Sequence, residues 1–448
     1  MFARILRFRF SLAQLLILTL MVSVILSCTV ALRRIWAFRF PEFPQDVQIS
    51  ADGALVGLVL RGSGRFCCVV CDAESGTAFR WAEFGGEPAS LELSRDLTTW
   101  AALFADGRIE SGSVGSARGC PAKPSPEFAP LLKPPAGSSW REQPDCPDIA
   151  LSGNGMVLAV SRSNQIAVFD TVTGAQTCLV TIPRETAGLY ALLGSPDKVL
   201  CFCLSDDGSR LAASYYRCRP AVSPLPAIAM WNAENGHLIG PPCFPDIMGS
   251  LRAAAWLGND AVAAVRHRVV GARSWGIGHQ GVLVVSVDGR QTVKEDFKPV
   301  PGRGTAAAGK QEWLEVQPLL AASTDGKTIV VPSSHFGGLL VLNAATLDVR
   351  YSIADPRCDP QQCLGLAISR DGARVAVISD DFNHPAGSHV SVVDMRSGEQ
   401  HEIRPHRNNV PRSAALLIPA GFLLAGCTWL MWRTAPRRPA TESQSAET

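Results

Sequence analysis

Three cysteines within five positions are the first residues in this sequence whose types and spacing suggest chemistry. The stretch CCVVCDAESG spans residues 67–76 and contains a Cys-x-x-Cys pair, Cys68 and Cys71. Such pairs occur in thiol redox sites, zinc sites and haem attachment sites. However, Asp72 follows the pair where haem attachment requires His, and the sequence has no second Cys-x-x-Cys at zinc spacing. We therefore expect no metal and no cofactor at this pair.

A second group of candidate ligands lies near the C-terminal end, where His384 and His389 share a predicted loop with Asp380 and Asp381. Imidazole rings bind transition metals, and carboxylates bind calcium. Loop histidines without an accompanying cysteine and acidic pattern are usually solvated. The sequence also lacks the G-x-S-x-G motif of serine hydrolases. We therefore expect neither a metal site nor catalytic residues here.

The elements that position these residues come from an internal repeat. One repeated phrase consists of an apolar residue, a Ser, a short turn ending in Gly and an apolar run. This phrase predicts a strand, a tight turn and a second strand. Its copies are ISADGALVGLVL from 49, LSGNGMVLAV from 151, LSDDGSRLAAS from 204, ASTDGKTIVV from 322 and ISRDGARVAVIS from 368. Weaker copies without the final Gly are LELSRDLTTWAALF from 91 and RAAAWLGNDAVAAV from 252.

A second phrase follows in five of the repeats and explains the cysteine pair. It has four mainly apolar residues, then Asp or Asn, then a turn: CVVCDAESG from 68, IAVFDTVTG from 166, IAMWNAENG from 228, LLVLNAATL from 339 and VSVVDMRSG from 390. Cys68 and Cys71 therefore take strand positions that other copies use for packing. Their Cα atoms would lie about 10 Å apart with side chains on opposite faces, too far for a disulfide. We expect both to be small buried hydrophobic residues.

The repeats predict an all-β fold. Seven units of about 52 residues each match the length of a four-stranded propeller blade with loop insertions. We therefore expect residues 41–402 to form a seven-bladed β-propeller, which closes into a ring without open sheet edges. A closed ring makes the first and last blades neighbours, so the chain leaves the ring near its entry point.

Two apolar segments flank the predicted ring. Residues 11–32 carry no charge and follow a short basic tail, residues 1–10. Residues 412–432 contain the apolar run AALLIPAGFLLAGCTWLMW and precede a polar tail, residues 433–448, expected to be disordered. Both are long enough to be transmembrane helices. For the first segment, a cleaved signal peptide or a lipoprotein lipidated at Cys28 are the alternatives.

The basic N-terminal tail favours cytoplasmic termini, which places the propeller on the extracytoplasmic side, where disulfides form. The candidate disulfides join Cys201 or Cys203 to Cys218 across a hairpin, and Cys358 to Cys363 in a loop. Sequence alone leaves both pairings open. The formal net charge is only +2, so we expect the lipid bilayer as a contact and no nucleic acid as a partner.

The two phrases also carry a family resemblance. Over about residues 44–402 the chain resembles the WD40-like, YVTN-type β-propeller proteins of bacteria, here membrane-anchored. The Gly-His and Trp-Asp signatures of eukaryotic WD40 repeats are absent as a set. The resemblance concerns an architecture that hosts many functions. With it, we expect a scaffold for protein binding or assembly, with an unidentified protein partner and no enzymatic activity.

Two alternatives remain: a small-ligand sensor with a site at the central channel, and a propeller enzyme of the quinoprotein type. Asp170, Thr173 and Gly174 match part of the quinoprotein blade phrase, but Cys178 stands where that phrase has Trp.

Specificity is expected in loop insertions. The longest, residues 121–147, has eight prolines in 27 positions, which predicts extended structure without a helix. A spacer between blades is favoured here over a partner-binding arm.

Overall fold

A computed structural model gives the fold of this chain. It describes residues 43–62, 65–84, 88–104, 106–116, 119–133, 148–182, 199–217, 225–244, 250–267, 280–295, 319–333, 338–354, 363–379 and 388–407. The two predicted membrane segments lie outside these ranges. Within the ranges, no helix is long and apolar enough to cross a bilayer.

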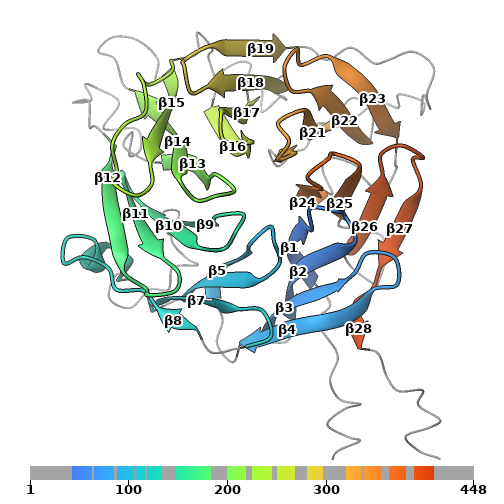
Figure 1. Cartoon of the computed structure of the whole chain (residues 1–448), viewed down its shortest axis with the longest axis horizontal. Helices are drawn as coiled ribbons and strands as arrows, with labels where there is room; N and C mark the ends of the chain where they lie inside the picture. Colours follow the sequence, from blue (N-terminus) through green and yellow to red (C-terminus); the bar gives the residue numbers. More distant parts are fainter. Residues whose placement is uncertain are drawn as a thin grey trace, which may run out of the picture. The chain divides into compact units, whose positions relative to one another are not determined.

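The described strands form seven antiparallel sheets arranged in a ring, which confirms the predicted seven-bladed β-propeller (Figure 1). Blade 1 contains β1 (Phe43–Ile49), β2 (Leu55–Gly62), β3 (Arg65–Asp72), β4 (Thr77–Phe84) and, at its outer edge, β28 (His406–Arg407). Blades 2 and 3 contain β5 (Pro88–Leu93), β6 (Thr99–Phe104), β7 (Ile109–Ser113), β8 (Cys120–Pro121), β9 (Asp148–Leu151), β10 (Val157–Arg162), β11 (Gln165–Asp170) and β12 (Gln176–Thr181).

The remaining four blades continue in chain order. Blades 4 and 5 contain β13 (Val199–Leu204), β14 (Arg210–Arg217), β15 (Leu225–Asn232), β16 (Ser250–Leu257), β17 (Ala261–His267), β18 (Gln280–Ser286) and β19 (Gln291–Glu295). Blades 6 and 7 contain β20 (Ala321–Ala322), β21 (Thr328–Ser333), β22 (Gly338–Asn343), β23 (Val349–Ala354), β24 (Cys363–Ile368), β25 (Arg374–Ser379), β26 (His389–Asp394) and β27 (Gln400–Ile403). The first strand of each blade lies nearest the ring axis (Figure 1).

The first repeated phrase is the turn between the innermost strand of a blade and the next strand. In blade 4, the Ser205 hydroxyl donates to Asp207 Oδ1 at 2.7 Å and accepts the Arg210 N–H at 3.0 Å. The same Ser–Asx hydrogen bond recurs in six blades, in the pairs Ser50–Asp52, Ser94–Asp96, Ser152–Asn154, Ser205–Asp207, Ser323–Asp325 and Ser369–Asp371. The repeated Ser and Asx therefore satisfy the polar groups of a turn beside the buried core.

Blade 2 departs from this phrase at its last turn residue. Gly53, like the equivalent Gly in four other blades, has a positive φ, and Leu97 takes this left-handed conformation in blade 2 with φ of 59°. An L-residue pays a steric cost of about 1–2 kcal/mol there. The Leu97 side chain is fully buried, in contact with the site of Gly57 in blade 1, and burying a leucine contributes about 1.5–3 kcal/mol. Burial thus offsets the strain.

The core is divided among the interfaces between neighbouring blades. Seven clusters of buried apolar side chains each join two adjacent sheets, so that every blade packs against both neighbours. Side chains alternate between the two faces of a strand. As predicted, Cys71 therefore packs towards blade 7, whereas Cys68 packs towards blade 2.

The ring closes between blades 7 and 1. The Arg370 N–H donates to Ala51 O at 3.1 Å, and the Arg374 guanidinium donates to Gly53 O at 3.1 Å. Because β1 and β28 belong to the same sheet, the chain enters and leaves the ring through blade 1. This confirms the expected proximity of entry and exit.

The start of the proline-rich insertion differs from the prediction. Residues Ala129–Leu132 form a short 3-10 helix, η1, although the proline density predicted extended structure throughout. Phe128 and Leu132 are buried in the interface between blades 2 and 3. The described part of this insertion is therefore part of the core and not a simple spacer, because Phe128 and Leu132 fill space between blades 2 and 3. The sequence did not predict this packing.

Candidate functional site

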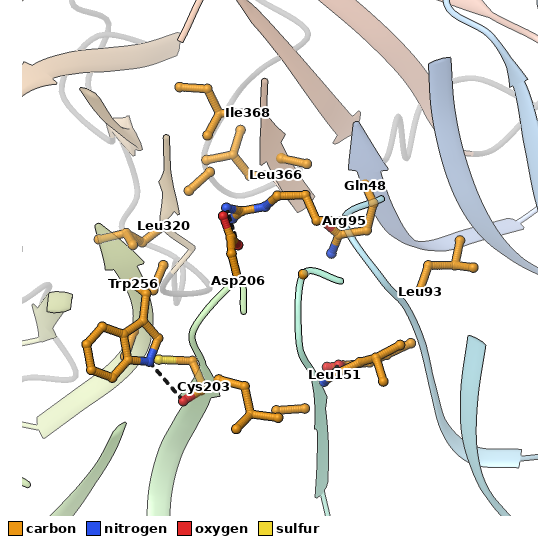
Figure 2. Close-up of a pocket in the computed structure, with 18 of the residues that line it drawn as sticks. Gln48, Leu93, Arg95, Leu151, Cys203, Asp206, Trp256, Leu320, Leu366 and Ile368 are labelled. Carbon is orange, nitrogen blue, oxygen red and sulfur yellow. Dashed lines mark hydrogen bonds and ion pairs between the residues drawn. The ribbon is translucent and has the colours of Figure 1, made fainter. Parts of the chain in front are cut away.

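A cavity of about 220 Å³ lies on the ring axis, and residues from the innermost strand of every blade line it. Figure 2 shows labelled side chains from these strands around the cavity. A cavity of this size holds about seven water molecules, at roughly 30 Å³ each. It is smaller than the roughly 300–1,000 Å³ pockets of drug-sized ligands. The site therefore suits a small molecule.

One repeat position supplies a ring of seven residues to this lining. The position lies two residues before the turn Ser, or before Leu257 in blade 5, on the innermost strand of each blade. Its residues in blades 1 to 7 are Gln48, Glu92, Ala150, Cys203, Ala255, Ala321 and Ala367. The polar residues all lie in blades 1, 2 and 4, whereas blades 5 to 7 contribute alanine. One side of the cavity is thus polar and the other apolar.

An ion pair crosses the axis at the turn end of the cavity. Arg95, in the turn of blade 2, lies 2.9 Å from Asp206 Oδ1 in the turn of blade 4 (Figure 2). Its second terminal nitrogen donates to Ala322 O in blade 6 at 3.4 Å. The Arg95 guanidinium therefore connects three alternate blades and narrows this end of the cavity.

Both members of the pair are partly shielded from solvent, with side-chain exposures of 24% for Arg95 and 37% for Asp206. Burial raises the pKa of Asp206 above its usual range, although the Arg95 charge and hydrogen bond act in the opposite direction. The cost of removing the carboxylate from water therefore outweighs the attraction of the guanidinium.

Glu92 is the principal charged group of the polar side. Its Oε2 accepts the Leu151 N–H of blade 3 at 2.8 Å. Burial raises the pKa of Glu92 well above its usual range, and the charges of Asp46 and Asp148 raise it further. Burial also raises the pKa of Asp46 to about 6. Carboxyl groups of three adjacent blades therefore act on one another along this side of the channel.

The arrangement is suited to binding. It offers one partly satisfied carboxyl group, an amide, an ion pair and an apolar wall around a partly open cavity, and such groups can hold and orient a small molecule. Among the described residues, no group of three or more His, Cys, Asp and Glu side chains could hold a metal ion.

The cysteines predicted to be inert are buried. Cys68 and Cys71 have no measurable exposure. Burial raises the pKa of Cys71 to about 12 and raises that of Cys68 well above its usual range, so neither forms a reactive thiolate at neutral pH. These observations agree with a packing role in β3.

The candidate disulfides stay predictions, because Cys218 and Cys358 lie outside the described residues. Cys201 Sγ lies 3.0 Å from Ser214 Oγ, and Cys203 lines the cavity. Cys363 is buried in the interface between blades 6 and 7.

The remaining candidates are the C-terminal loop residues and the quinoprotein-like phrase. His384, Asp380 and Asp381 lie outside the described residues. His389 begins β26 instead of lying in a loop, and its Nδ1 is 3.1 Å from Glu402 Oε1. In the quinoprotein-like phrase, the Asp170 carboxylate accepts the Thr173 N–H at 2.7 Å, which is the hydrogen bond of an ordinary turn after a strand.

Sequence reasoning missed Arg95, Asp206 and Glu92. Only Glu92 had a signal in the repeats, because it stands at a position that holds Ala in four blades. A charged residue at a position that is otherwise small and apolar marks a departure from the repeat. The repeated phrases define turns and strands, however, and do not indicate which side chains from different blades meet at the axis.

Comparisons with known proteins support the fold. No protein-family model matches the sequence, and no curated protein sequence matches it. A solved structure of Kuenenia stuttgartiensis hydrazine synthase is similar, with a TM-score of 0.50, 10% sequence identity and coverage of 80% of this chain and 97% of that chain. At this identity the similarity concerns the β-propeller alone and carries no activity to this chain.

Proposed function

We propose that this protein is a membrane-anchored, extracytoplasmic β-propeller that acts as a scaffold for protein binding or assembly. The observation that carries the proposal is the closure of the ring, because β1 and β28 share the sheet of blade 1. The N-terminal and C-terminal membrane anchors would then both connect to blade 1. The loops of the other blades would stay accessible on a rigid support, which is how binding loops are commonly displayed.

The repeats support the family part of this proposal. The Ser-x-Asp-Gly phrase forms the turn after the innermost strand, and the apolar-Asx phrase forms the third strand of the blade in blades 1, 3, 4, 6 and 7. These are the features on which the resemblance to WD40-like, YVTN-type propellers depends. The resemblance implies a bacterial binding module more readily than an enzyme.

The topology is tested by thiol labelling of intact cells. Val172 lies in the turn after β11 and is 64% exposed, whereas Val168, four residues earlier, lies within β11 and is fully buried. Because the chain has 14 native cysteines, labelling is compared with that of the unsubstituted protein. We expect Val172→Cys to add a site that reacts with a membrane-impermeant maleimide in intact cells, and the matched control Val168→Cys to add none. Labelling of Val172→Cys only after membrane disruption would reverse the proposed orientation.

The scaffold role is tested with a photo-crosslinking amino acid at the same two positions in native membranes. We expect the exposed position 172 to capture a discrete protein that mass spectrometry identifies, and the buried position 168 to capture none. Probes on exposed turns of all seven blades that capture only lipid or this chain itself would contradict a protein-binding role.

The axial cavity supports a second candidate, a sensor of a small ligand. The specific observation is the division of the cavity into a polar side with Gln48 and Glu92 and an apolar side formed by blades 5 to 7. Purified full-length protein should bind a small molecule with one-to-one stoichiometry. Stoichiometric quinone or transition metal in the purified protein would instead favour the enzyme alternative.

A further inference from the structure

We infer that the axial cavity binds a small organic cation, with an ammonium group held by the Glu92 carboxylate and a short apolar skeleton against blades 5 to 7. This inference rests on the second proposed function, the small-ligand sensor, and names the chemical class of its ligand. It is independent of the protein-binding scaffold.

The first argument is the incomplete hydrogen bonding of Glu92. Its Oε2 accepts the Leu151 N–H at 2.8 Å, whereas its Oε1 accepts no hydrogen bond from the described residues. A carboxylate has about four acceptor positions on its two oxygens. A carboxyl group in this cavity with one backbone partner therefore has capacity for a further donor, and an ammonium group supplies three.

The second argument is the sign of the local charge. The charged groups that act on Glu92 are Asp46 and Asp148, both carboxylates on neighbouring blades. Arg95 is the cation of the cavity lining, and it already forms an ion pair with Asp206 at 2.9 Å. A positively charged ligand would relieve the repulsion among these carboxylates, whereas an anionic ligand would increase it or would have to displace Asp206 from Arg95.

The third argument is the shape and polarity of the opposite wall. Ala255, Ala321 and Ala367 of blades 5 to 7 line the cavity beside Leu320 and Leu366. Small side chains at the repeat position leave room, and the leucines provide an apolar surface. The cavity volume of about 220 Å³ limits the apolar skeleton to a few carbon atoms.

The test is calorimetric titration of the full-length protein in detergent with n-butylammonium, n-butanol and butyrate, three probes of similar size with a positive, a neutral and a negative head. We expect n-butylammonium to bind and the other two probes to bind at least about tenfold more weakly, because neither can donate a charge-assisted hydrogen bond to Glu92. Glu92→Gln keeps an acceptor for the Leu151 N–H and removes the charge. It should weaken n-butylammonium about tenfold or more.

Glu234→Gln, which removes an exposed carboxylate from a turn of blade 4, is the matched control and should leave the affinity unchanged. Circular dichroism of both variants checks folding. The affinity for n-butylammonium should also rise with pH as Glu92 loses its proton. The charged or titratable groups around Glu92 are Asp46, Asp148, Arg95, Asp206 and Cys203.

The outcomes separate this inference from the sensor function. Preferential binding of butanol or butyrate, or unchanged n-butylammonium affinity in Glu92→Gln, overturns the assignment of a cation and leaves the cavity as a ligand site. Absence of binding for all three probes overturns both the cation site and the small-ligand sensor.

Discussion

The contact between Gly57 and Leu97 gives a quantitative test of how blades 1 and 2 fit together. A Cβ added at Gly57 would lie 2.5 Å from Leu97 Cδ2 and 3.1 Å from Leu93 Cδ1. Leu97 is fully buried and cannot move into solvent without losing its packing. We expect Gly57→Ala to destabilise the protein by about 1–3 kcal/mol, the usual cost of overpacking a core. Leu97→Ala should cost about 2–5 kcal/mol through the cavity that it leaves.

The double variant is the decisive measurement. The methyl group added at residue 57 would occupy part of the space that Leu97→Ala vacates, so the double variant should lose at least about 1 kcal/mol less than the sum of the single losses. Leu97→Gly should be no less stable than Leu97→Ala, because Gly adopts the positive φ of 59° without strain. The assay is urea unfolding of the full-length protein in detergent, followed by tryptophan fluorescence. Additivity within about 0.5 kcal/mol would refute the proposed contact.

Three further predictions concern single side chains. Cys68→Val and Cys71→Val should each change the free energy of unfolding by less than about 1.5 kcal/mol, and in the native protein both thiols should resist iodoacetamide; rapid modification would contradict their burial. Asp46 has a pKa raised to about 6, so the folded state binds more protons than the unfolded state between about pH 4 and 6, and stability falls as pH rises through this window. Asp46→Asn should reduce this slope, to which Glu92 and Asp206 also contribute, and should stabilise the protein at pH 8 by up to about 3 kcal/mol. Thermal unfolding across pH would measure both effects, and an unchanged slope would show that Asp46 does not contribute to it. Ser323→Ala removes a buried hydroxyl that donates to Asp325 at 2.7 Å and should cost about 1–3 kcal/mol, whereas a loss below about 0.5 kcal/mol would show that water replaces it.

The position of each blade was predictable because the repeated phrases are local. A Ser–Asx turn needs only six neighbouring residues, and the alternation of apolar side chains along the third strand is also contained in one segment. Comparison of the repeats therefore placed Cys68 and Cys71 in a strand and assigned them to opposite faces, as their packing in two different interfaces confirms. The departure at Leu97 was visible as a missing Gly, but its compensation by Gly57 was not.

The candidate site was not predictable in the same way. Arg95 and Asp206 are 111 positions apart, and nothing in either local sequence indicates that their turns meet over the axis. Glu92 likewise stands in an ordinary strand pattern, and its interaction with Asp46 and Asp148 depends on three blades being neighbours. The burial of Phe128 in an interface was missed for the same reason, because proline content reports local conformation and not distant contacts.

By itself, the sequence determined the number of blades, the strand and turn phrases within them, the inert nature of the cysteine pair and the existence of two apolar flanking segments. Each of these follows from periodicity or composition within a short stretch of chain. Only the tertiary structure decided which side chains face the axis together, because closure of the ring brings seven separate segments to one place. The division of the cavity into a polar and an apolar side is therefore a property of the closed ring and of no single repeat.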